Sequence, residues 1–160
     1  MTAKRKLSAK LFAMDEPVRA SYDQDVYGWA NEQSALLRAG KFSAADIENI
    51  AGEIESLGKS QKSELVSRLI ILILHMLKWQ FQPKFRGTSW ELSIKEQRRR
   101  VAIHMRDNPS LKSGLVVAMA DAYGVAVVRA QRQAKLMAGV FPARCPYSFA
   151  QVMDEDFWPE

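Results

Sequence analysis

Apolar and polar residues follow one another along this chain with the three-and-four spacing of α-helices, and no pair of β-strands is indicated. A first helix is predicted over residues 30–38, and Asp23 or Asp25 can cap its start. Gly40 suits the left-handed conformation that often follows a helix. The pattern therefore predicts a short helix that ends in a tight turn.

A second helix is indicated by an apolar stripe with spacings of three, four and three residues. Ser43, followed by Asp46 three residues later, resembles a capping box that would start this helix. Gly58 is predicted to end it, and Gly52 lies inside it, where a glycine permits close packing. The stripe, which we expect to face the core, consists of Ile47, Ile50, Ile54 and Leu57.

The third predicted helix, over residues 60–80, is apolar on nearly every side. Such a helix must be buried on nearly every side, so residues 65–79 are expected to form the central rod of the fold. One narrow polar line runs along it, interrupted by Ile71. At 100° per residue, its members lie within about 40° of a common direction. They are Glu64, Arg68, His75, Lys78 and Gln82.

Two more long helices and a short one follow. A helix over residues 89–107 is predicted from the stripe Trp90, Ile94, Gln97, Val101 and Met105. A helix over residues 111–137 contains many alanines, which allow close approach of a neighbour, and Gly139 closes it. Ser148 and Gln151 form a capping-box pattern for a last short helix. The prediction is an all-α fold, a helical bundle of about five main helices with a short C-terminal helix.

The composition is that of an ordinary globular domain. The chain has 160 residues, of which 48% are hydrophobic and 26% charged, and this excludes wholesale disorder. Residues 1–19 are predicted to form a mobile basic tail, and residues 20–160 a single all-helical domain. No secretory signal and no uninterrupted apolar stretch of about 18 residues is found. A cytoplasmic protein without membrane contact is therefore expected.

The net charge of +5 is unevenly distributed. Residues 15–64 hold ten acids and five bases, whereas residues 65–144 hold fourteen bases and four acids. The acidic region and the basic region can attract each other electrostatically when they pack, so the overall charge supports nucleic-acid binding only weakly. Binding to the phosphate backbone needs lysine and arginine side chains on one surface that are not paired with acids. The best local candidates for that surface are Lys95, Arg99 and Arg106.

His75 is the group on the polar line that titrates near neutral pH. The simplest interpretation is that the line is the solvent-facing edge of the rod, with Glu64 and Arg68 as an i,i+4 pair. Alternatively, part of the line faces a cleft, and His75 has a carboxylate from the second helix beside it. There His75 would be an acid, a base or a ligand, and Arg98 an anion clamp. This candidate polar site comprises Glu53, Glu55, His75 and Arg98.

Metal and nucleophile chemistry have little support. Neither His75 nor His104 has the Glu three residues earlier that a di-metal bundle uses, although a mononuclear site from His75 and glutamates stays open. Cys145, the one cysteine, has no nucleophile signature around it and is typical of a small buried hydrophobe. Residues 58–60 match the end of a phosphate-binding loop motif, but Glu53 stands where the first glycine of that motif belongs. No metal and no cofactor is predicted.

Distinctive motifs occur in order along nearly the whole chain. They are residues 22–40, Ile-Ala-Gly-Glu-Ile-Glu-Ser-Leu-Gly at 50–58, His-Met-Leu-Lys-Trp-Gln-Phe-Gln-Pro at 75–83, Ser-Trp-Glu-Leu-Ser-Ile-Lys-Glu-Gln-Arg-Arg-Arg at 89–100, and residues 108–111 and 145–159. Together they resemble the bacterial family called domain of unknown function twenty-nine. The resemblance implies an all-helical protein and brings no established activity or ligand.

The same resemblance implies which positions deserve attention. Family members often carry an acid where this chain has Gly52, which weakens any scheme based on an acidic cluster there. The shared pattern includes the positions of Glu53, Glu55, His75, Trp79, Gln80, Trp90, Glu96 and Arg98.

The chain lacks a complete catalytic constellation, so the leading prediction is a non-catalytic interaction or regulatory module that binds a protein or a second copy of itself. An enzyme or small-ligand binder at the candidate polar site is the alternative. Nucleic-acid binding through Lys95, Arg99 and Arg106 is a further one. The acidic, aromatic ending at residues 154–159 either docks back on the basic helices or binds a partner.

Overall fold

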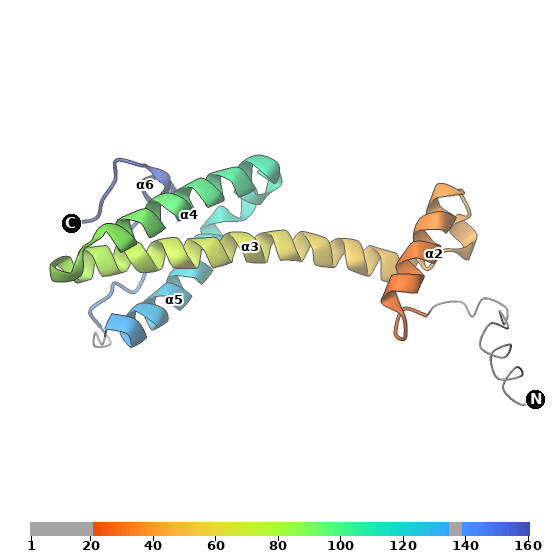
Figure 1. Ribbon diagram of the computed structural model, residues 1–160, viewed down its shortest axis with the longest axis horizontal. Helices are drawn as coiled ribbons and strands as arrows, with labels where there is room; N and C mark the ends of the chain where they lie inside the picture. Colours follow the sequence, from red (N-terminus) through yellow and green to blue (C-terminus); the bar gives the residue numbers. More distant parts are fainter. Residues whose placement is uncertain (1–20, 135–138) are drawn as a thin grey trace, which may run out of the picture. The chain divides into compact units, whose positions relative to one another are not determined.

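The computed structural model describes residues 21–134 and 139–160 (Figure 1). Within these ranges it contains helices and no strand, which confirms the predicted all-α fold with a short C-terminal helix. Three short 3-10 helices lie between the α-helices, at Phe42–Ala44, Pro83–Phe85 and Pro109–Gly114. The α-helices are α2 (Val26–Arg38), α3 (Ile47–Phe81), α4 (Thr88–Asp107), α5 (Leu115–Ala134) and α6 (Phe149–Met153).

The chain divides into two compact units, Met1–Glu55 and Ser56–Glu160. The boundary between them falls within α3. The predicted tail, residues 1–19, lies outside the described residues. The division into a tail and one domain therefore stays a prediction.

In the N-terminal unit, α2 has the predicted caps. The Asp25 side chain accepts a hydrogen bond from the Gly28 N–H at 2.9 Å, which satisfies a backbone donor at the start of the helix. Gly40 has a φ of 69°, a conformation that favours glycine. The helix begins at Val26, earlier than predicted, because this cap lies upstream of the apolar run.

Asp46, and not Ser43, caps the start of α3. Its carboxylate accepts a hydrogen bond from the Asn49 backbone N–H at 3.3 Å and another from the Asn49 side-chain amide at 2.8 Å. The indole Nε1 of the buried Trp29 also donates to it, at 3.2 Å. These bonds, the one from the Asn49 side chain above all, lower the pKa of Asp46. Ser43 lies in a 3-10 turn instead.

The predicted helix end at Gly58 is wrong. The helix α3 continues through both Gly52 and Gly58, because a glycine costs only about 1 kcal/mol in a helix and the good helix formers around it outweigh that. The predicted burial of the apolar stripe is wrong as well, since Ile47, Ile54 and Leu57 are exposed. A Cβ atom at Gly52 would meet nothing within 4 Å, so this glycine serves no close packing.

In the C-terminal unit, the second half of α3 is the buried centre, as predicted. In Figure 1, α4 and α5 flank this half of α3, and their inner faces share its core. The predicted stripe of α4 is buried at Ile94, Gln97, Val101 and Met105. Core side chains that are fully or almost fully buried are Leu65, Leu69, Leu72, Ile73, Met76, Leu77, Ile94, Val101 and Val152.

The helix α5 begins at Leu115, after a 3-10 segment, rather than at residue 111. Its predicted end at residue 137 lies outside the described residues. It packs on the core through alanines at four-residue intervals, which allow its backbone to approach closely. These alanines are Ala118, Ala122, Ala126 and Ala130.

The short helix α6 is confirmed. The Ser148 hydroxyl accepts from the Gln151 N–H at 3.2 Å, and the Gln151 Oε1 accepts from the Ser148 N–H at 2.9 Å, which is the predicted reciprocal cap.

Candidate functional site

The polar line of α3 lies at the edge of the C-terminal unit, where its members are half-buried. The Nδ1 atom of His75 is 2.8 Å from the backbone oxygen of Ile71, one turn earlier in the same helix. Because a carbonyl oxygen can only accept, Nδ1 carries the proton. Burial lowers the pKa of His75, and the nearby charge of Lys78 acts in the same direction. The surroundings of His75 in the bundle thus favour the neutral imidazole, although the hydrogen bond to Ile71 acts in the opposite direction.

Arg98 is buried, with 3% of its surface exposed, and it binds the C-terminal segment. Its guanidinium donates to the backbone oxygens of Val152 at 2.8 Å, Glu155 at 3.2 Å and Phe157 at 2.6 Å. The Trp158 ring lies 5.5 Å from its Cζ atom. Burial lowers the pKa of Arg98, although the neighbouring acids oppose this. Each guanidinium nitrogen has a backbone partner, so Arg98 closes the C-terminal segment over α4.

The ring of Trp158 also packs on Trp79 of α3, with centroids 4.7 Å apart. The acidic, aromatic ending thus docks back on the helices, the first of the two possibilities raised by the sequence.

Glu53 and Glu55 are exposed in the N-terminal unit, whereas His75 and Arg98 belong to the C-terminal unit. Glu53 accepts a hydrogen bond from the Tyr22 hydroxyl, and this bond raises the pKa of Tyr22. The bonds of His75 and Arg98 go to backbone oxygens, as described above. In the described residues, no group of three or more His, Cys, Asp or Glu side chains could hold a metal ion.

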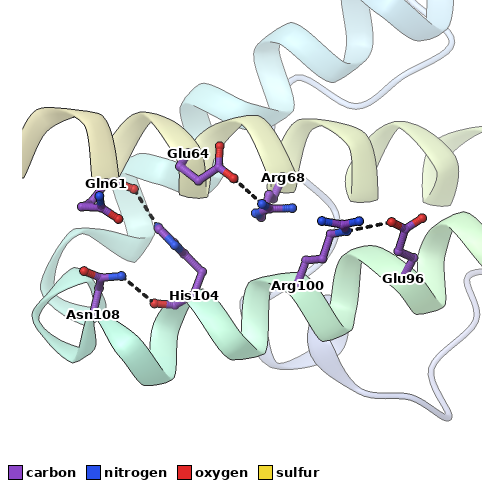
Figure 2. A network of polar contacts seen from close by, with 7 residues as sticks. All are labelled: Gln61, Glu64, Arg68, Glu96, Arg100, His104 and Asn108. Atoms are coloured by element: carbon purple, nitrogen blue, oxygen red, sulfur yellow. Dashed lines mark hydrogen bonds and ion pairs between the residues drawn. The ribbon is translucent and has the colours of Figure 1, made fainter. Parts of the chain in front are cut away.

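A second polar network joins α3 to α4 (Figure 2). The Nε2 atom of His104 on α4 lies 2.8 Å from the backbone oxygen of Gln61 on α3, and Asn108 donates to the backbone oxygen of His104 at 3.1 Å. Arg68 and Arg100 line a small pocket of about 190 Å³ beside this contact. Arg68 pairs with Glu64, and Arg100 with Glu96 at 2.7 Å. The network therefore carries no surplus charge, and it ties the two helices together.

The predicted basic surface is largely neutralised by its neighbours. Lys95 pairs with Glu91, and Arg106 with Asp107 at 2.8 Å, a contact that raises the pKa of Arg106. Arg99 is exposed. Two of the three candidate bases thus already have a carboxylate partner, which reduces the unpaired charge that phosphate binding needs.

The sequence did not predict the outer face of α5. Here large apolar side chains point away from the core: Val116 is 83% exposed, Val128 63% and Val117 52%. Asp121 is the charged residue among them, and it makes no hydrogen bond or ion pair within the described residues. We call this surface the α5 outer face; it consists of Val116, Val117, Ala120, Asp121, Gly124, Val125 and Val128.

The α5 segment is apolar on nearly every side, so its sequence did not indicate that one side is exposed. Within the described residues, Pro109–Gln133 is the segment that is long and apolar enough to cross a bilayer, judged by length and composition alone. Only 28% of its apolar window is buried in the fold. The available signal was the spacing of the four core-facing alanines, which leaves the valines on the opposite side.

An apolar groove adjoins the α5 outer face and shares Val116 and Ala120 with it. Its volume is about 440 Å³, and it lies between α5 and the segment leading into α6. Cys145 lines it, and burial raises the pKa of this thiol, as expected of a small buried hydrophobe rather than a nucleophile. Other lining residues are Leu115, Met119, Tyr123, Ala143, Arg144, Tyr147, Ser148 and Phe149.

Fold and surface together define a small all-α protein whose C-terminal unit presents an apolar helix face to solvent. The family model described as "Domain of unknown function DUF29" matches residues 21–158, so the chain belongs to this family. Neither the curated proteins nor the solved structures compared with the chain include a match.

Proposed function

We propose that the protein is a non-catalytic interaction module and that the α5 outer face binds a protein partner. The observation that carries this proposal is the exposure of the valines on a helix whose opposite side is firmly packed. Contiguous exposed apolar surface of this kind marks interaction sites in soluble proteins, because burying it releases hydration water. The adjoining groove extends the same apolar surface.

The chemistry of the face favours a protein over a lipid surface. Asp121 stands in its middle, and a lone carboxylate in hydrocarbon costs roughly 2.5–3.5 kcal/mol even by the lower scales. A protein partner can instead present a base to this carboxylate. The buried alanines Ala122 and Ala126 also hold α5 against the core, so the helix cannot enter a bilayer without giving up that packing.

The contacts of the candidate polar site support a role other than catalysis. The guanidinium of Arg98 is bonded to three backbone oxygens, and His75 is bonded within its own helix. We therefore place the interaction on the exposed apolar face of α5.

Site-specific photo-crosslinking tests this proposal. A benzophenone amino acid at position 117, in the full chain expressed in the cells that make it, is expected to give a discrete covalent adduct. The same probe at the exposed position 102 of α4 is the matched control and should give none. No adduct from position 117, or equal adducts from both positions, would contradict the proposal.

A further inference from the structure

Two charges on the outer side of α5 indicate which partner fits it. Asp121 and Arg132 are eleven residues apart, which places them on the same side of the helix within about 20°. At 1.5 Å per residue they are also about 16 Å apart along the axis, too far to pair within one helix. Both side chains are exposed, and neither has an ion pair within the described residues.

A second α5 running in the opposite direction satisfies both charges at once. If the two helices cross near residue 126, each Asp121 lies beside the partner's Arg132, and the two-fold symmetry makes the contact twice. A parallel pair would instead set Asp121 against the partner's Asp121, and like charges side by side are unfavourable.

Small residues at the crossing point make room for the second helix. In an antiparallel pair, Gly124 lies opposite the partner's Val128. Gly124 is exposed, and a Cβ atom there would meet nothing within 4 Å, so the space above it is open. Ala120, one turn earlier, is also small and exposed. The valine of each copy can therefore fill the space above the glycine of the other.

We infer that the protein forms an antiparallel homodimer through the α5 outer face, held by apolar contact and by two reciprocal ion pairs between Asp121 and the partner's Arg132. This inference rests on the proposed function, and it names the partner of that surface as a second copy of the chain. A standard protein–protein interface buries about 1,600 Å² of accessible surface, and one pair of crossing helices buries less than this. The dimer is therefore expected to be reversible.

Sedimentation equilibrium of the full chain, over a wide range of concentration, tests the arrangement by charge reversal. Asp121→Arg and Arg132→Asp should each raise the dissociation constant roughly tenfold or more, because each puts like charges together twice. The double variant should return to within a few-fold of the wild type, since its pairs are reversed but complementary. Arg99→Asp, an exposed charge change on α4, is the matched control and should leave the dimer unchanged.

Each other outcome overturns the inference. The inference is wrong if the wild-type chain stays monomeric at all concentrations. It is also wrong if neither single variant weakens the dimer. Failure of the double variant to restore the dimer, although circular dichroism shows it folded, excludes the antiparallel register. A monomeric wild type whose position-117 probe captures a different protein refutes the homodimer alone, whereas a monomer without any adduct refutes the proposed function too.

Discussion

Replacing Leu72 by alanine is expected to lower the free energy of unfolding by about 3 kcal/mol. Leu72 has no exposed surface, and it packs in the core that α3 shares with α4 and α5. Alanine in its place removes apolar contacts and leaves a cavity that a close-packed interior fills only partly. Denaturant unfolding measures the loss, as a lower midpoint at an unchanged slope.

Leu57 of the same helix is the matched control. Its side chain is 64% exposed, so Leu57→Ala should change the free energy of unfolding by no more than about 0.5 kcal/mol. The two substitutions remove the same atoms from one continuous helix, and only burial differs. Equal losses at the two positions would show that Leu57 is buried after all.

The second large effect is expected at Arg98. Arg98→Met keeps most of the aliphatic stem but removes three hydrogen bonds to backbone oxygens of the C-terminal segment. A hydrogen bond to a charged group is worth about 1.5–3 kcal/mol, and part of the loss is recovered when the freed carbonyls reach water. We expect a net loss of about 3 kcal/mol, together with a change in tryptophan fluorescence as Trp158 leaves Trp79.

Two comparisons isolate the role of the Arg98 bonds. Arg98→Lys keeps the charge but cannot reach all three oxygens, so it should fall between the wild type and the methionine variant. Arg99→Met, at the exposed neighbouring position, should be close to neutral. If Arg98→Met proved as stable as Arg99→Met, with unchanged fluorescence, Arg98 would not fasten the C-terminal segment.

Much of the fold could be predicted from patterns of residues that are close together in the sequence. The cap at Asp25, the reciprocal cap of Ser148 and Gln151, and the buried second half of α3 were predicted because each depends on residues close together in the chain. Gly58 misled the prediction, because the tendency of a single glycine to end a helix is weaker than the combined propensity of its neighbours.

Features that depend on distant segments could not be predicted. The partners of Arg98 are backbone oxygens more than fifty positions later, and a backbone oxygen has no sequence signature. Both sides of α5 are apolar, so the spacing of its alanines could indicate which side packs on the core but not that the other side lacks a partner in the chain. The sequence therefore placed Arg98 in a candidate polar site without indicating that it bonds to the C-terminal segment.

The most direct test of the central claim combines Val117→Lys and Val128→Lys in one chain. If the α5 outer face is exposed in the folded protein and buried only on association, the free energy of unfolding of the monomer should change by less than about 1 kcal/mol. Association measured by sedimentation should be abolished. A loss of stability of about 3 kcal/mol or more would show that the valines belong to the core, and undiminished association would place the interface elsewhere.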